Sequence, residues 1–152
     1  MLDATKAFDT VEYCTLFQLL VGCDLPSAWL RLPVNIYTNS STRIVWNGIC
    51  SALFLVNNGV KQGGVMSPIL FCIYLDGLLN LLAAAQISCF IGRVFVGCLA
   101  YTDDIVLIAP TTGAMRNMLA VCDSFAKEYD LVFNEKIPYG YCLGISVIVL
   151  VK

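Results

Sequence analysis

The sequence predicts one α+β domain, and three observations support this prediction. The chain has 152 residues, a length typical of a single domain. No linker, internal repeat or low-complexity segment divides it. Its predicted elements follow the order β-α-α-β-β-α-β-β-α-β, which favours a layered α+β fold. They are a strand within 1–9, helices at 11–21 and 26–37, strands at 42–46 and 52–56, a helix at 68–85, strands at 95–101 and 105–109, a helix at 112–129 and a β-like segment at 131–133. An apolar β-branched tail follows at 143–151.

The N-terminal elements are indicated by a capping pattern and by helical spacing. Residues 9–12 read Asp-Thr-Val-Glu, the spacing of an N-cap with its capping-box glutamate, so Asp9 is interpreted as a structural cap. Apolar residues then recur with helical spacing as far as Gly22, and again after Pro26. We expect Pro33 to kink or end the second of these helices.

Turn and cap signals define the remaining elements. Asn47-Gly48 between two β-prone runs is a strong hairpin signal. Ser67-Pro68 has the form of an N-cap followed by proline at the first helical position. The helix that follows is apolar nearly all round, which predicts an interior position. Two further β-rich runs meet across residues 102–104, and a last helix with core spacing starts after Pro110.

Composition limits the chemistry that this chain can perform. It has no histidine, 9 Lys+Arg, 11 Asp+Glu and 59% hydrophobic residues. Without histidine, Ser-His and Cys-His catalysis and the usual zinc and haem sites are excluded. A net charge of −2 does not supply a basic groove that neutralises several phosphates. The hydrophobic share exceeds what a free-standing domain of this size needs, so we expect some apolar surface to lack its natural cover.

Cysteines and apolar runs bear on the cellular compartment. No two of the eight cysteines are closer than nine residues, which is not metal spacing. Their apolar neighbours favour reduced, buried thiols over disulfides. No run reaches about 18 apolar residues without a charge, and the candidate at 62–75 stops at Asp76. We therefore expect an intracellular protein without a membrane span.

Three acidic residues lie in apolar surroundings: Asp3 at the end of the first strand, and Asp103 and Asp104 at a hairpin tip. Burying three carboxylates close together is costly, because desolvation and mutual repulsion both disfavour the charged form. Two divalent cations would remove that cost, and such a pair can clamp the oxygens of a phosphoryl transfer. The alternative is ordinary turn chemistry for Asp103 and Asp104, and a solvated strand end for Asp3.

Four blocks of sequence resemble, in order, the motifs of the reverse transcriptase domain of LINE-type non-LTR retrotransposons. LDATKAFD at 2–9 resembles motif A, and NGVKQGGVMSPILF at 58–71 resembles motif B. AYTDD at 100–104 resembles motif C, and LVFNEK within about 125–137 is a weaker match to motif D. The resemblance covers roughly residues 2–137 and implies an RNA-directed DNA polymerase, a nucleotidyltransferase that extends a DNA primer with dNTPs on an RNA template.

The resemblance implies a palm subdomain whose antiparallel sheet packs against helices, with the motif A strand beside the motif C hairpin. Asp3 and Asp103 would then hold two Mg²⁺ ions, with Mn²⁺ as an alternative metal. Asp104 would be a further ligand or an electrostatic support. Gln62 and Gly63 of motif B would contact the templating base and the incoming nucleotide, where glycine lets the backbone approach the substrate.

Phe8 bears on the choice of sugar. A bulky ring five residues after Asp3 resembles the family's steric gate, which leaves no room for a ribose 2′-OH and implies a DNA product. The alternative is a core residue that packs against the first helix.

The sequence departs from the family pattern at motifs C and D. Thr102 replaces the alanine usual in motif C, and Ile137 stands where motif D normally has its lysine, a candidate proton donor to pyrophosphate. Lys136 is the neighbouring substitute, and its alternative role is that of an exposed, solvated lysine.

The chain begins two residues before Asp3, so we expect residues 1–152 to form a single partial domain. It would lack most of the fingers and all of the thumb, and would be inactive or nearly so in isolation. Two alternatives from other classes are a degenerate coding relic that folds poorly and an interaction module that keeps the palm fold without catalysis.

Overall fold

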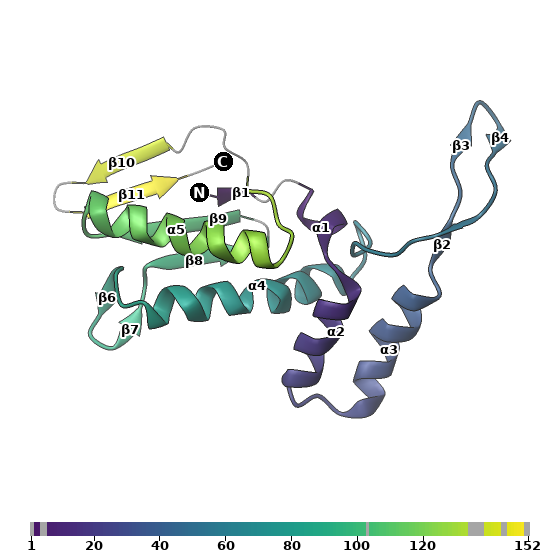
Figure 1. Cartoon of the computed structure of the whole chain (residues 1–152), viewed down its shortest axis with the longest axis horizontal. Helices are drawn as coiled ribbons and strands as arrows, with labels where there is room; N and C mark the ends of the chain where they lie inside the picture. Colours follow the sequence, from purple (N-terminus) through teal and green to yellow (C-terminus); the bar gives the residue numbers. More distant parts are fainter. Residues whose placement is uncertain (1, 4–5, 103, 134–138, 144–145, 151–152) are drawn as a thin grey trace.

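The computed structural model describes residues 2–3, 6–102, 104–133, 139–143 and 146–150 (Figure 1). The helices are α1 (Ala7–Thr10), α2 (Tyr13–Gly22), α3 (Ser27–Thr38), α4 (Ser67–Ala84) and α5 (Thr112–Glu128). The strands are β1 (Leu2–Asp3), β2 (Ser41–Thr42), β3 (Val45–Trp46), β4 (Ile49–Cys50), β5 (Phe54–Leu55), β6 (Phe90–Ile91), β7 (Val94–Phe95), β8 (Cys98–Tyr101), β9 (Asp104–Ala109), β10 (Tyr139–Leu143) and β11 (Ser146–Leu150). Helices and antiparallel strands are mixed, which confirms the predicted α+β class.

Strand β9 is the centre of the main sheet. Ile105 has antiparallel partners on both sides, Ala100 of β8 and Leu2 of β1. Further along, Leu107 pairs with Cys98 of β8 and with Val149 of β11. Strands β1 and β11 therefore follow one another along the same side of β9, and β10 completes the sheet beyond β11. The predicted β8–β9 hairpin is confirmed, with Asp104 already inside β9.

The core lies between one face of this sheet and helices α4 and α5, and it continues along α4 to the buried side of α2 (Figure 1). Odd-numbered residues of β9 are buried and even-numbered residues are half-exposed, the alternation of a strand with one covered face. The buried side chains of α4 and α5 repeat at helical spacing, as the sequence predicts for α5. They are Leu70, Phe71, Tyr74, Leu75, Leu78 and Leu82 of α4, and Met115, Met118, Cys122, Phe125 and Ala126 of α5.

Helix α4 is less enclosed than the sequence predicts. Ile69 is 63% exposed and Leu81 49% exposed, because only one face of the helix packs against the core. By length and composition alone α4 could also cross a membrane, although it contains Asp76, the charge that ends the apolar run at 62–75 in the sequence. This is weak evidence for a span, because the core helix of a soluble protein passes the same test.

The predicted capping box at residues 9–12 is wrong. Asp9 lies inside the short helix α1, and Glu12 is the N-cap residue of α2. The Glu12 carboxylate accepts a hydrogen bond from Thr15 Oγ1 at 2.8 Å. Val11 separates the two helices with an extended backbone and is fully buried, so tertiary packing, rather than a local cap, sets this boundary.

Helix α3 is followed by an arm, residues 41–55, which contains strands β2 to β5. Pro33 lies within α3, which continues to Thr38, so of the two predicted effects the end of the helix is wrong and the kink stays a prediction. The predicted turn at Asn47-Gly48 is confirmed, with φ values of 48° and 79° as a type I′ turn requires. The second strand begins at once, at Ile49, and only Phe54–Leu55 of the predicted 52–56 strand is paired.

This arm, residues 41–55, extends away from the core in Figure 1 and leaves apolar side chains in solvent. Trp46 is 76% exposed and Ile49 is 75% exposed. Apolar surface without cover, as the composition predicts, is therefore concentrated here.

The remaining differences between the predicted and the observed strands involve small hairpins. The predicted 95–101 strand is divided between β7 and β8, and β7 forms an unpredicted hairpin with β6 around Gly92. The predicted apolar tail at 143–151 supplies β11 and the last residue of β10, and these two strands form a hairpin. Of the predicted β-like segment at 131–133, only Phe133 forms a bridge.

Candidate active site

Strand β1 brings the first predicted metal-binding acid to the motif C hairpin. Asp3 is the direct antiparallel partner of Asp104. The Cα atoms of directly opposed residues in such a ladder are about 4.5–5.5 Å apart. Asp103 lies outside the described residues. The backbone arrangement thus agrees with the predicted convergence of motif A and motif C, and the catalytic roles of the three acids stay predictions.

Asp104 is half-exposed and belongs to the even-numbered set of β9, opposite the face covered by α4 and α5. Carboxylate oxygens on neighbouring strands are the hard ligands that Mg²⁺ prefers, so this donor set fits the implied metal. Within the described part of the chain, no three or more His, Cys, Asp or Glu side chains gather as a metal site, and one predicted ligand, Asp103, is not in that part.

The motif B loop packs directly on the start of α1 and α2. The Val60 N–H donates to Phe8 O at 2.6 Å, and the Gly59 N–H donates to Val11 O at 2.8 Å. The Tyr13 hydroxyl donates to Gly59 O at 2.9 Å. Burial, with a smaller effect of the neighbouring Tyr37, raises the pKa of Tyr13, so its hydroxyl stays a donor. The loop and the motif A segment therefore form one hydrogen-bonded unit.

Ser67 closes the other end of this loop. It is not an N-cap, contrary to the prediction, because α4 begins at Ser67 itself and Met66 is the capping position. The Ser67 hydroxyl donates to Lys61 O at 2.5 Å and lies 3.5 Å from the Tyr37 hydroxyl. Pro68 is at the start of the helix, as predicted.

Gln62 and Gly63 are both exposed at the turn of the loop. Gly63 has φ +77° with open space where a side chain would lie, which suits close approach of a substrate to the backbone. Gln62 Nε2 donates to Asp9 Oδ1 at 3.1 Å. A groove of about 670 Å³ opens beside them. Its lining is Asp9, Tyr13, Tyr37, Ser40, Ser41, Thr42, Val56, Asn58, Gly59, Val60, Lys61 and Gln62.

Phe8 is partly buried, with its ring 5.2 Å from the ring of Phe71 in α4. This contact gives Phe8 a packing role on α4, which agrees with the alternative of a core residue, and its packing on the first predicted helix stays a prediction. The gate role stays a prediction. Thr102 has φ +53°, a strained conformation for a β-branched residue, so this departure from the family pattern does lie at a tight tip. Lys136 and Ile137 lie outside the described residues.

Several residues of the loop unit were not identified as functional from the sequence. Tyr13 and Tyr37 received no role, and Asp9 was assigned to a local cap. Their partners are between 30 and 53 positions away in sequence. The motif B resemblance was the one signal that pointed to this region, because it marks the loop that these side chains hold.

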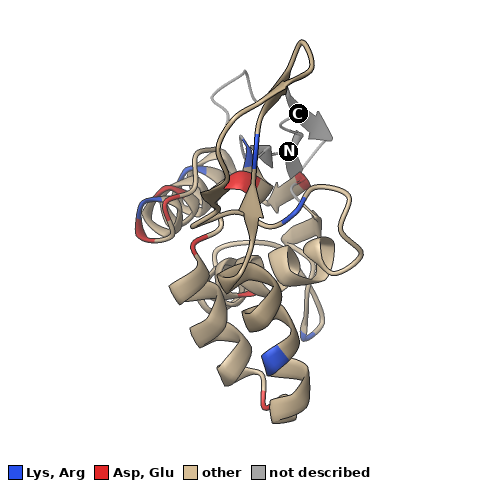
Figure 2. Ribbon diagram, turned by 90° about the vertical axis from the view of Figure 1, so that its right-hand side faces the viewer, with Lys and Arg blue, Asp and Glu red and all other residues tan. Residues whose placement is uncertain are grey.

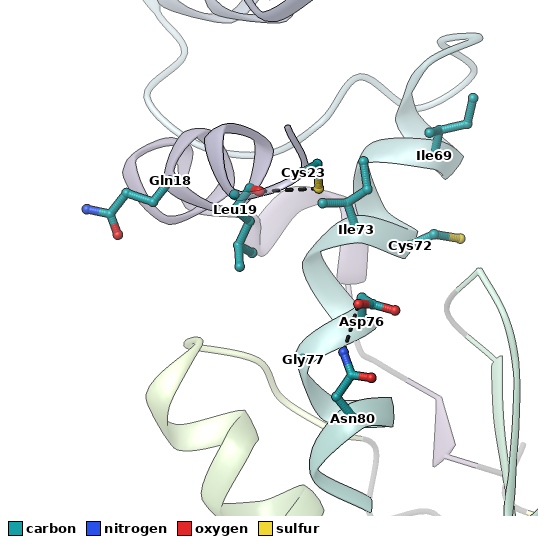
Figure 3. Close-up of a pocket in the computed structure, with 10 residues that line it drawn as sticks. Gln18, Leu19, Cys23, Ile69, Cys72, Ile73, Asp76, Gly77 and Asn80 are labelled. Carbon is teal, nitrogen blue, oxygen red and sulfur yellow. Dashed lines mark hydrogen bonds between the residues drawn. The ribbon is translucent and has the colours of Figure 1, made fainter. Parts of the chain in front are cut away.

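A second cavity, of about 510 Å³, lies between α2 and α4 and contains none of the predicted site residues (Figure 3). Its walls are largely apolar. Asn80 donates to Asp76 at 2.9 Å on one side, and the Cys23 thiol donates to Leu19 O at 3.3 Å on the other. Cys72 also lines this second cavity, so its walls contain two thiols, those of Cys23 and Cys72.

The prediction of buried cysteines is only partly right. All seven cysteines whose side chains the structure describes are free. Cys98 and Cys122 are buried and Cys89 is intermediate. The four exposed thiols are Cys14, Cys23, Cys50 and Cys72. Apolar sequence neighbours do not bury a cysteine when the helix or arm that carries it has one open face.

Alkylation should separate these two classes. With iodoacetamide at about pH 8, we expect the four exposed thiols to react at least about tenfold faster than Cys98 and Cys122, because the thiolate is the reactive form. Burial raises the pKa of Cys98 to about 11 and, with a smaller effect of Cys98, that of Cys122 to about 12. Peptide mass spectrometry over time would measure this. Equal rates in the native protein would contradict the described packing.

Comparison with known proteins gives consistent matches. Residues 1–136 match the family model described as "Reverse transcriptase (RNA-dependent DNA polymerase)". The retrovirus-related Pol polyprotein from type-2 retrotransposable element R2DM of Drosophila melanogaster is 32% identical over 133 residues, which are 88% of this chain and 12% of that protein. The polyprotein from the type-1 retrotransposable element R2 of Nasonia vitripennis is 30% identical over 131 residues, which are 86% of this chain and 13% of that protein. The polyprotein from the type-1 element R2 of Popillia japonica is 28% identical over 136 residues, which are 89% of this chain and 22% of that protein. The chain thus spans 12% to 22% of the length of these relatives.

Proposed function

This chain belongs to the reverse transcriptase family, and from that premise we propose that it carries the catalytic, palm-like part of an RNA-directed DNA polymerase of a LINE-type retrotransposable element. The observation that supports this most directly is the pairing of Asp3 with Asp104. It brings together two segments that are about a hundred residues apart in sequence and that match motif A and motif C.

The proposed reaction is the template-directed addition of a deoxynucleotide to a primer. The primer 3′-oxygen forms a bond to the α-phosphorus of a dNTP, and the bond from that phosphorus to the bridging oxygen breaks to release pyrophosphate. Two Mg²⁺ ions, when bound by Asp3 and Asp103 with support from Asp104, would stabilise the charge on the attacking and leaving oxygens. Gln62 and Gly63 would position the new base pair, and Lys136 would give a proton to pyrophosphate.

An RNA template and a DNA primer are the proposed partners, and their phosphates would meet the chain where it has no acidic residues. Residues 25–75 contain no acid and three cations, Arg31, Arg43 and Lys61. This stretch includes α3, the arm and the motif B loop, which adjoin the groove. Figure 2 shows the Lys and Arg residues of the described chain scattered and not gathered in one patch. Phosphate contacts from this chain alone would therefore be few.

Primer extension tests the proposal. The 152-residue chain would be mixed with an oligo(dT) primer on a poly(rA) template, dTTP and Mg²⁺, with a chelator as the control. Extension that requires metal supports the polymerase. Cooperative thermal unfolding without extension would fit both a palm fragment that is inactive in isolation and the non-catalytic interaction module, and the lack of cooperative unfolding by circular dichroism would favour the relic.

The steric gate can be tested by shortening Phe8. In Phe8→Val we expect the preference for dTTP over UTP to fall by roughly 10- to 100-fold, the usual effect of pocket shape on discrimination. The measurement is the ratio of kcat/KM for the two nucleotides. Phe71→Leu is the matched control, because it loosens the same ring contact from the α4 side. An equal loss of discrimination in both variants would mean that Phe8 acts only through packing.

A further inference from the structure

Asp9 and Gln62 join the two segments that carry the proposed active site. Asp9 lies in α1, directly after the motif A strand, and Gln62 lies in the loop before α4. Their hydrogen bond, 3.1 Å from Gln62 Nε2 to Asp9 Oδ1, connects residues 53 positions apart. Both side chains are exposed, and an isolated exposed contact of this kind would have little effect.

Backbone hydrogen bonds on either side of this contact change that expectation. Val60 N–H binds Phe8 O, and Gly59 N–H binds Val11 O. Val60 is also 2% exposed, so the loop is anchored in the core just before Gln62. Because the backbone of both segments is already fixed, the bond between Gln62 and Asp9 has to order only their two side chains and no further backbone.

The chemistry of a carboxylate fixes which way the Gln62 amide points. An ionised carboxylate can only accept hydrogen bonds, so the amide nitrogen has to face Asp9. The amide oxygen, Oε1, then points away from Asp9. Both side chains line the 670 Å³ groove. Gln62 can therefore present an acceptor there, whereas a neutral amide at position 9 would bind either end of Gln62.

We propose that Asp9 is a positioning residue, which holds Gln62 so that Oε1 accepts a hydrogen bond from a donor group of the bound nucleotide. This rests on the proposed polymerase function, because it states how one residue of that site meets its substrate. Asp9 does not touch the reacting atoms and acts through Gln62 alone.

Asp9→Asn tests the proposal, since asparagine keeps the size of aspartate and loses its acceptor-only character. In the 152-residue chain we expect the KM for dTTP to rise about tenfold while kcat changes less than about twofold. Asp24→Asn is the matched control. It removes the same charge from an exposed turn at φ 51°, a conformation that asparagine tolerates.

A second measurement needs no nucleotide. Gln62 is one of three glutamines, so a Gln62→Met spectrum would assign its side-chain amide signals in heteronuclear NMR. We expect Asp9→Asn to shift these signals and Asp24→Asn to leave them in place. Unchanged signals in Asp9→Asn would overturn the bond itself. Shifted signals with an unchanged KM would overturn the positioning role and leave the polymerase intact. A wild-type chain that binds no dTTP would overturn both proposals.

Discussion

Asp103→Asn is expected to reduce whatever metal-dependent primer extension the chain supports by about a hundredfold to a thousandfold, the usual cost of losing one electrostatic group at a reacting centre. The amide has the size of the carboxylate but lacks the negative charge that would hold a cation. Because the change would remove one of the three acids that the proposed site brings together, it should not lower stability. Steady-state extension rates at saturating Mg²⁺, together with the Tm of each protein, would measure both effects.

Asp123→Asn is the control for this experiment. Asp123 forms an exposed pair with Lys127 at 2.7 Å in α5, and such a pair contributes about 0.3–0.5 kcal/mol. Its loss should leave extension unchanged. If Asp103→Asn extends a primer as fast as the wild-type chain, the hairpin acids have only a turn role, and the polymerase proposal fails with them.

The long elements could be predicted because each has a strong local signal. The spacing of Met115, Met118 and Phe125 identifies α5, and Asn47-Gly48 identifies the arm hairpin. Short elements have no such signal. Helix α1 and the β6–β7 hairpin have four residues and two paired residues per strand, so contacts from elsewhere in the chain decide whether they form.

In the candidate site, too, residues with a strong local signal were identified from the sequence, and residues whose partners are distant in sequence were not. The acids at 3, 103 and 104 were identified because a motif marks each one, and the backbone pairing of Asp3 with Asp104 agrees with that interpretation. Asp9 was misassigned because its local pattern satisfies a capping box, while its partner Gln62 is 53 residues away. Ser67 was misassigned in the same way, since its hydroxyl binds Lys61 O and not its own helix. Local spacing cannot distinguish a cap from a long-range contact made by the same kind of side chain.

Gly59→Ala should cause the largest loss of stability among the glycine changes in the loop. Gly59 has φ +84°, a conformation that costs a residue with a Cβ about 1–2 kcal/mol. A Cβ here would also lie 3.0 Å from both Cα and O of Asp9 and 3.1 Å from Phe8 O, all backbone atoms that cannot rotate away. With about 1–3 kcal/mol for overpacking, we expect a loss of about 3 kcal/mol. Differential scanning calorimetry should show a Tm lower by about 6–12 °C.

Gly48→Ala separates the two contributions to this loss. Gly48 has a similar φ of +79°, but nothing lies within 4 Å of its Cβ position. Only the backbone term, about 1.5 kcal/mol, applies there, so its Tm should fall by about 3–6 °C. Because the Asp9 backbone is what the added methyl group would displace, Gly59→Ala should also move the Gln62 amide signals, and Gly48→Ala should not. Equal losses of Tm in the two variants would mean that the motif B loop does not press on α1, and the single hydrogen-bonded unit described for the site would be wrong.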